Sequence, residues 1–175
     1  MSSAEMELEN RLAEMRRLFD QSFAAEGQVE AAAKEQMIAI KAGGEDFAVR
    51  LRDVSGLAVS KGKILPVPSR VAELLGITGI RGMVVPVFSL AALLASPPAA
   101  TPPRWLMFCG GKQAPIALAF DDVEGHFAAA STDIYQGDTE RGYVTETARD
   151  GVRLRSVLAV ARIVDYITQR KPSGS

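Results

Sequence analysis

The sequence predicts a mainly β protein made of two small, pseudo-equivalent barrels that share one core, with an amphipathic helix ahead of them. Two observations support the barrels. From residue 36 onward, short alternating strands are separated by turns about every ten residues, a density that favours small barrels over an open sheet. The same order of elements then occurs twice along the chain, which indicates an internal duplication.

Composition sets the limits of function. The chain has 175 residues, 47% of them hydrophobic and 23% charged, enough for one packed domain with an appendage. A net charge of -1 gives no basic surplus for nucleic acid, so no nucleic-acid partner is expected. Cys109 is the single cysteine and His126 the single histidine, which excludes a disulfide framework and the usual His- or Cys-based metal sites. No cofactor or metal is expected.

Residues 1–35 predict an amphipathic helix followed by a linker. The first part is rich in Ala, Glu, Leu, Met and Arg, and Gly27 ends the pattern. Apolar residues at steps of four and three form one stripe: Leu8, Leu12, Met15, Phe19 and Phe23. Two interpretations stay open. The helix packs back on the following domain or frays as a tail, or it docks a further partner or a second copy of the chain.

The start of the chain is charged rather than apolar, which argues against a cleavable signal peptide. Apolar runs are broken well before the ~18 residues that a membrane span needs. We therefore expect a cytoplasmic protein without direct membrane insertion.

Residues 36–168 predict the β domain, with a first half at 36–95, a Pro-rich linker at 96–103 and a second half at 104–168. Each half contains two hairpins. Their turns are expected at Gly43-Gly44, Arg81-Gly82, Gly110-Gly111 and Asp150-Gly151. A short helix closes the domain, and residues 169–175 predict a disordered tail.

Comparison of the chain with itself supports the duplication. At an offset of 69, residues 48–59 align with 117–128, and the shared pattern includes Ala, Asp-Val and Gly. At an offset of 70, residues 87–94 align with 157–164. The order of hairpin, Asp-Val-x-Gly step, second hairpin and short apolar helix is the same in both halves.

No catalytic constellation stands out. Gly43 to Phe47 read GGEDF and resemble the GG(D/E)EF signature of diguanylate cyclases, but Asp46 replaces the Glu of that family, and the long α/β stretch ahead of the signature is missing. A hairpin turn explains the segment better. A small carboxylate-dependent nucleotide enzyme stays as an alternative, with these candidates: Glu45, Asp46, Asp121 and Asp122. Cys109 fits a buried apolar position, since His126 is the one possible base.

Residues 65–90, LPVPSRVAELLGITGIRGMVVPVFSL, resemble the central signature of CheW-like domains, in which a proline-bearing loop and short helix lead to N-L-R-G and then P-V-x-D-L. Here G-I-R-G stands at 79–82 and P-V-F-S-L at 86–90. The likeness covers about residues 36–168. It implies two five-stranded, SH3-like barrels. Three positions depart from the family pattern, where Gly79 replaces Asn, Ser89 replaces Asp, and Gly56 stands in place of an exposed Glu.

The resemblance also implies a function. CheW-like proteins are non-catalytic adaptors that couple the cytoplasmic tip of a chemoreceptor to a CheA-type histidine kinase. Carried over to this chain, Arg81 with Gly82 lies in the partner contact region, and Val54, Leu57 and Val84 line a groove between the barrels. We expect a scaffold of a chemosensory two-component pathway, one that controls surface motility or pili. A dimeric structural protein held by the N-terminal helix is the alternative.

Overall fold

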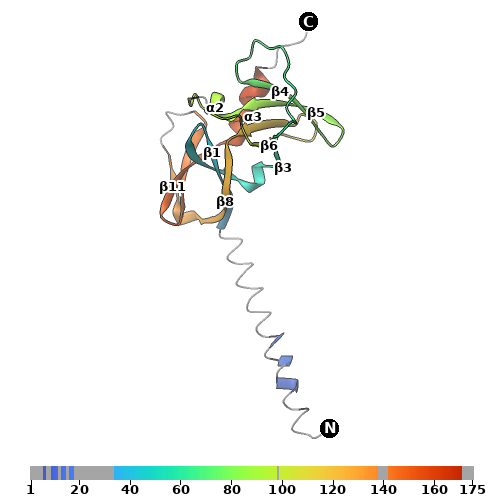
Figure 1. Cartoon of the computed structure of the whole chain (residues 1–175). Coiled ribbons are helices and arrows are strands. Elements are labelled where there is room, and N and C mark those ends of the chain that lie inside the picture. The colour runs from blue at the N-terminus through green and yellow to red at the C-terminus, as the bar shows by residue number, and fades with distance from the viewer. Residues whose placement is uncertain are drawn as a thin grey trace. The chain divides into compact units, whose positions relative to one another are not determined.

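The structure is a computed structural model (Figure 1) that describes residues 6, 9–11, 13–14, 16–17, 34–97, 99–137 and 142–170. The chain divides into two compact units, Met1–Glu35 and Gln36–Ser175. In the first unit, the described residues before Lys34 are helical, as predicted, and their side chains are exposed. The predicted apolar stripe lies outside the described residues: Leu8, Leu12, Met15, Phe19 and Phe23.

The second unit contains two curled sheets, which we call barrel 1 and barrel 2. Barrel 1 has six strands in the order β8-β1-β2-β11-β10-β9. These are β1 (Lys34–Ala42), β2 (Glu45–Arg50), β8 (Asp122–Ala130), β9 (Ile134–Gln136), β10 (Val144–Asp150) and β11 (Arg153–Leu158). The sequence predicted five strands, because β9 has three residues and is too short to show an alternation.

Barrel 2 has the predicted five strands, in the order β3-β6-β7-β5-β4. These are β3 (Gly56–Val59), β4 (Leu74–Ile80), β5 (Met83–Ser89), β6 (Trp105–Cys109) and β7 (Ile116–Phe120). Four short helical segments join or close the sheets: η1 (Leu51–Asp53), α2 (Leu90–Leu93), η2 (Ser131–Asp133) and α3 (Val160–Gln169). The helix α3 is the predicted closing helix, and it includes the first residue of the predicted tail.

Strand register reproduces the duplication. In barrel 2, β5 lies parallel to β7 with Val87 opposite Ala117. In barrel 1, β11 lies parallel to β2 with Val157 opposite Ala48. The offset of 70 relates Val87 to Val157, and the offset of 69 relates Ala48 to Ala117. Both outer hairpins carry an irregularity at matching places, between Leu74 and Gly76 in one and between Val144 and Glu146 in the other.

The two sequence halves exchange strands between the barrels. Residues 51–120 supply all of barrel 2, whereas barrel 1 combines β1 and β2 with the four strands that follow residue 121. Figure 1 shows this mixing by colour, since blue and orange strands lie together in barrel 1. A barrel therefore does not correspond to one repeat. Each barrel contains one hairpin from each repeat, and a pair of parallel strands joins the two hairpins.

Apolar side chains form three clusters. The largest lies between the sheets and combines residues of β1, β2, β6 and β7 with α2 and α3, including Phe47, Met107, Phe120, Leu90 and Ile163. Smaller clusters fill each barrel, around Val85 and Phe108 in barrel 2 and around Met37 and Val157 in barrel 1. The alternation of each strand explains this division, because its two faces serve a barrel interior and the shared core.

Candidate protein-interaction surfaces

Arg81 and Gly82 form the two-residue turn between β4 and β5, at one tip of barrel 2. Their φ angles are 49° and 76°, both in the left-handed region that a tight hairpin turn needs. Glycine adopts this conformation freely, whereas arginine does so rarely. The Arg81 side chain is exposed. An unfavourable backbone conformation that presents a cation to solvent motivates a functional role for this tip.

Apolar side chains lie near this turn on barrel 2. Val84 is 71% exposed, Met83 42% and Leu65 64%. Leu65 is bridged to Ile77 of β4 by two backbone hydrogen bonds of 2.8 and 2.9 Å. Gly79 lies opposite Val84 in the strand pair, and a Cβ atom there would have open space around it. Met83 and Val84 are consecutive in β5, so their side chains point to opposite faces of the sheet. We call Arg81, Val84 and Leu65 the tip surface.

The other predicted contact residues lie on a different part of barrel 2. Leu57 and Val59 on the edge strand β3 are 38% and 49% exposed, and Val54 just before it packs partly buried against the shared core. The strands β6 and β7 separate β3 from β5 in the sheet. Val84 is therefore no sheet neighbour of Val54 or Leu57. We call the exposed side of Leu57 and Val59 the β3 surface.

The three departures from the family pattern have different structural consequences. The Ser89 hydroxyl accepts a hydrogen bond of 3.2 Å from Ala92 N and caps α2, which is a role that an aspartate also performs. A Cβ atom on Gly56 would meet Phe108 at an ordinary 3.7 Å, and one on Gly79 would meet nothing. Packing does not require glycine at either place, so these two changes alter the surface rather than the fold.

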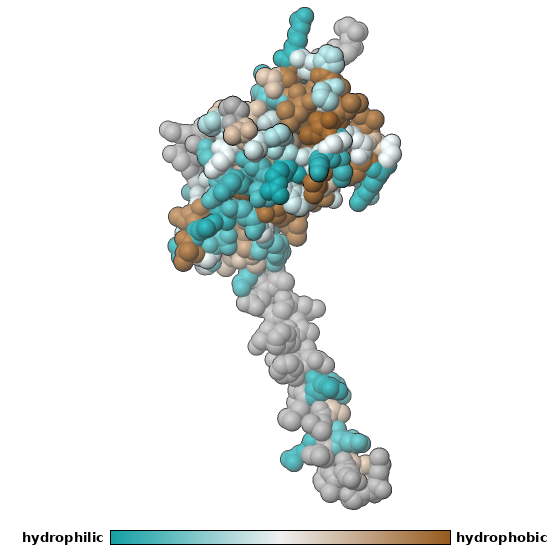
Figure 2. Space-filling view, in the orientation of Figure 1, coloured by the Kyte–Doolittle hydropathy of each residue, from teal (hydrophilic) through white to brown (hydrophobic). Residues whose placement is uncertain are grey.

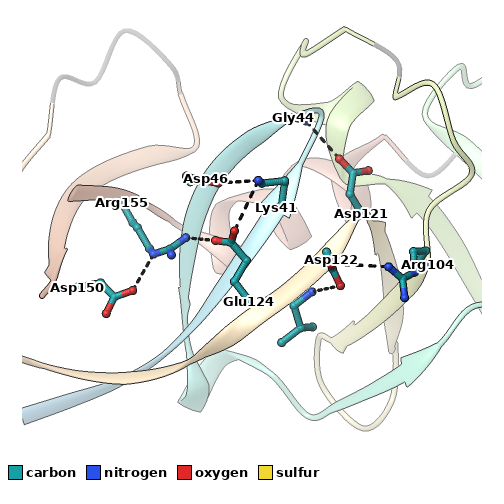
Figure 3. A network of polar contacts seen from close by, with 10 residues as sticks. Lys41, Gly44, Asp46, Arg104, Asp121, Asp122, Glu124, Asp150 and Arg155 are labelled. Carbon is teal, nitrogen blue, oxygen red and sulfur yellow. Dashed lines mark hydrogen bonds and ion pairs between the residues drawn. The ribbon is translucent and has the colours of Figure 1, made fainter. Parts of the chain in front are cut away.

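Carboxylates of the alternative enzyme hypothesis hold the structure together (Figure 3). Asp121 accepts a 3.2 Å hydrogen bond from the backbone N–H of Gly44. Asp122 accepts a 3.1 Å bond from the Trp105 indole and one from Val123 N, and it lies 3.8 Å from Arg104. Asp46 pairs with Lys41 at 3.5 Å. The GGEDF segment is the turn between β1 and β2, as predicted, with both glycines left-handed.

Cys109 is 1% exposed, and burial, reinforced by the nearby charge of Asp53, raises the pKa of its thiol to about 12. The thiol stays protonated at neutral pH and cannot act as a nucleophile. Among the described residues, no group of three or more His, Cys, Asp or Glu side chains is arranged to hold a metal ion.

Barrel 1 contains an ionic cluster around one buried arginine. The Arg155 guanidinium is 3% exposed and contacts two carboxylates, Asp150 at 3.0 Å and Glu124 (Figure 3). Glu124 also lies 3.6 Å from Lys41. Its hydrogen bond from Arg155 lowers the pKa of Glu124 against the opposing effect of burial. The cluster joins four strands of barrel 1, β1, β8, β10 and β11, and is structural in character.

Sequence reasoning missed a pocket of about 360 Å³ beside α3. Side chains of β5, β7, α2 and α3 and residues of the loop before β4 line it, and Val84 of the tip surface lies on its edge. The residues of the loop before β4 show no hydrophobic periodicity, and no other pattern in the sequence indicates that they lie beside α3.

Exposed apolar and basic surfaces on two fused barrels are the features of a protein-interaction module. The family model for the CheW-like domain matches residues 36–167, and the chain belongs to that family. It is therefore a non-catalytic scaffold of the chemotaxis type, an adaptor in signal transduction.

The structural comparison agrees with this assignment. Scaffolding protein TtCheW from Thermoanaerobacter tengcongensis shares the fold with a TM-score of 0.62 at 16% identity, over 71% of this chain and 88% of that chain. No curated protein sequence matches the chain. Within the part of the chain that the structure describes, no helix combines the length and the hydropathy that a membrane crossing requires.

Proposed function

We propose that this chain couples the cytoplasmic tip of a chemoreceptor to a CheA-type histidine kinase, in the cytoplasm, in a pathway that controls surface motility or pili. The observation that carries the proposal is the Arg81-Gly82 turn, an exposed cation held in a left-handed conformation beside apolar side chains. A charged anchor next to exposed apolar groups is typical of a protein-binding hot spot.

Both proposed surfaces suit protein partners. The β3 surface is an exposed edge carrying Leu57 and Val59, whose backbone and side chains offer a docking strip for an amphipathic helix or strand. The tip surface adds Val84 and the Arg81 charge. Because β6 and β7 lie between the two surfaces, each can contact a different partner at the same time, as a coupling protein requires.

Calorimetric titration of the full chain with a receptor cytoplasmic fragment and with the kinase tests this proposal. Arg81→Glu is expected to weaken at least one of these interactions about tenfold, the loss typical of a hot-spot residue. Arg153→Glu is the matched control, because Arg153 is an exposed arginine beside the equivalent turn of barrel 1. Unchanged affinity in Arg81→Glu, or equal losses in both variants, would contradict the role of Arg81.

Gly56 offers a second test. Gly56→Glu restores the charge that the family pattern has before Leu57, and the position has room for a side chain. If β3 contacts a partner, the substitution changes receptor or kinase affinity while the melting temperature stays close to that of the wild type. A glutamate at exposed Gly111, where a side chain also has open space, serves as the control.

The helix in residues 1–35 is proposed to bind a further partner or a second copy of the chain. Light scattering on the full chain and on a variant without residues 1–30 gives the two masses. A dimer that becomes a monomer on deletion supports self-association, whereas equal oligomeric states would contradict it.

A further inference from the structure

We propose that the pocket beside α3 is a separate docking site, which takes an acidic amphipathic segment of another protein. The site goes beyond the coupling function proposed above. Val84 of the tip surface also lines it, but the rest of its lining and its charges are supplied by residues outside the Arg81 turn and β3.

The pocket offers an apolar floor of a size suited to side chains. Pro86 and Phe88 of β5 and Ile116 of β7 line it from the sheet, and Tyr166 and Ile167 line it from α3. Its volume of about 360 Å³ falls in the range of small ligand sites and has room for a few apolar side chains. The floor is rigid, because Ile116 is 5% and Ile167 8% exposed, both packed into the shared core.

The charges around this floor are mainly positive. Arg170 lines it, Arg70 stands between the lining residues Ser69 and Val71, and Lys112 precedes the lining residue Gln113. On the anionic side, the exposed Asp165 precedes the lining residue Tyr166. Arg70 and Lys112 are exposed. The one lining carboxylate, Glu73, is already paired with Arg170 at 3.2 Å. An incoming segment thus meets more cationic than anionic groups around an apolar floor.

This local excess is part of a larger asymmetry between the barrels. Residues 51–120, which make barrel 2, contain seven Lys and Arg against two Asp and Glu. The described residues of barrel 1, at 34–50, 121–137 and 142–158, contain six basic against nine acidic. A positive field over barrel 2 attracts acidic partners and repels basic ones. Charge complementarity therefore selects an acidic occupant, and the apolar floor requires that it be amphipathic.

The molecular surface agrees with this arrangement. Figure 2 shows hydrophobic surface gathered over the end of the domain that carries β4 and β5, with hydrophilic groups at its borders. An apolar centre with a polar rim is the usual anatomy of a protein interface.

The test starts from a library of random short peptides displayed on phage and selected on the immobilised full chain. Enriched peptides are synthesised with a fluorophore, and fluorescence anisotropy gives their affinities. We expect peptides in which apolar residues alternate with Asp and Glu, and an affinity that falls as salt screens the basic rim.

Ala114→Glu is the decisive variant, since Ala114 is an exposed lining residue. The substitution places a negative charge in the pocket, which repels the negative charges of an acidic peptide. It is expected to weaken peptide binding about tenfold. Lys112→Glu should give a smaller loss, of about threefold. Ala161→Glu on the exposed side of α3, away from the pocket lining, is the control and should leave binding unchanged. Equal melting temperatures of the variants confirm that each is folded.

Selection of neutral or basic peptides, or unchanged binding of acidic peptides to Ala114→Glu, would overturn the proposal. Loss of receptor or kinase binding in Ala114→Glu would assign the pocket to the coupling contacts and would overturn it as a separate site. Self-association of the wild-type chain that Ala114→Glu abolishes would identify a second copy as the occupant instead. If Ala114→Glu loses peptide binding and still binds the receptor and the kinase, the proposal is supported. This holds whether or not Arg81→Glu weakens receptor or kinase binding.

Discussion

Barrel 1 and barrel 2 have matching strands and register, yet they fill the same interior position with different chemistry. Arg155 in barrel 1 is 3% exposed and pairs with Asp150 and Glu124. The offset of 70 places Val85 at the equivalent position of barrel 2, where it is fully buried among apolar side chains, and Ile80 at the position of Asp150. The same backbone arrangement is therefore compatible with an ionic side chain or an apolar side chain at this interior position.

This difference shows what the duplication determines. The outer hairpins, their irregularity and the parallel pairs are common to both halves, whereas strand lengths and interior side chains have diverged. The buried Arg155 must recover the desolvation of its charge through well-placed carboxylates, so it is sensitive to the loss of either one. An apolar contact tolerates change more gradually.

The largest expected effect comes from breaking the ionic cluster. Arg155→Ala removes a buried side chain together with its hydrogen bonds to two partly exposed carboxylates, and should lower the free energy of unfolding by about 4 kcal/mol. Val85→Ala makes the matching change in barrel 2 and should cost about 2 kcal/mol, for lost burial and a small cavity. Urea unfolding measures both. A smaller loss for Arg155→Ala than for Val85→Ala would contradict the comparison.

A second difference between the barrels lies at the irregularity of the outer hairpins, where barrel 2 has Gly76 and barrel 1 has Glu146. A Cβ atom on Gly76 would lie 2.2 Å from the carbonyl oxygen of Leu65, and its φ of +155° also disfavours a side chain. Gly76→Ala should therefore cost about 3 kcal/mol. Gly151→Ala, at a left-handed turn with open space, should cost about 1 kcal/mol and is the control. Thermal unfolding distinguishes them.

Transplanting the barrel 2 interior into barrel 1 tests whether the ionic cluster is needed at all. The triple variant Arg155→Val, Asp150→Ile and Glu124→Ser takes the residues found at the equivalent positions, 85, 80 and 55. Removing these three members leaves Lys41 paired with Asp46 at 3.5 Å, so the stability should stay within about 1 kcal/mol of the wild type. A loss as large as that of Arg155→Ala would show that the two interiors are not interchangeable.

The smallest expected effect is on the acid sensitivity of barrel 1. The hydrogen bond from Arg155 lowers the pKa of Glu124 from its ordinary value of 4.5. Its contribution is therefore complete above that value and is lost as pH falls through the lower folded-state pKa. Glu124→Gln should reduce the loss of stability between neutral and acid pH by less than about 1 kcal/mol. Melting curves across this range measure the slope, and an unchanged slope would contradict the ion pair.

Local pattern accounts for the parts of the fold that the sequence predicts. The turn at Arg81-Gly82 and the offsets of 69 and 70 depend on neighbouring residues, and both are found in the structure. Which hairpins share a barrel depends on the parallel pairing of distant strands, which no local pattern records. The exchange of hairpins between halves therefore stayed hidden.

Interior chemistry was equally hard to predict. In β11, Leu154 is 61% exposed while its neighbour Arg155 is buried, the reverse of what hydropathy alone suggests. The family resemblance led to Arg81, and it also assigns Val54, Leu57 and Val84 to one groove, which stays a prediction. The strand order separates the β3 residues from Val84 by two strands.

The central claim is that this scaffold bridges a receptor and a kinase, and the mass of the three-component mixture tests it most directly. Size-exclusion chromatography with light scattering is run on the receptor fragment and the CheA-type kinase, with and without the full chain. We predict a complex of all three that forms only when the chain is present and that Arg81→Glu weakens. A receptor–kinase complex of the same mass without the chain, or a chain that elutes alone, would contradict the account.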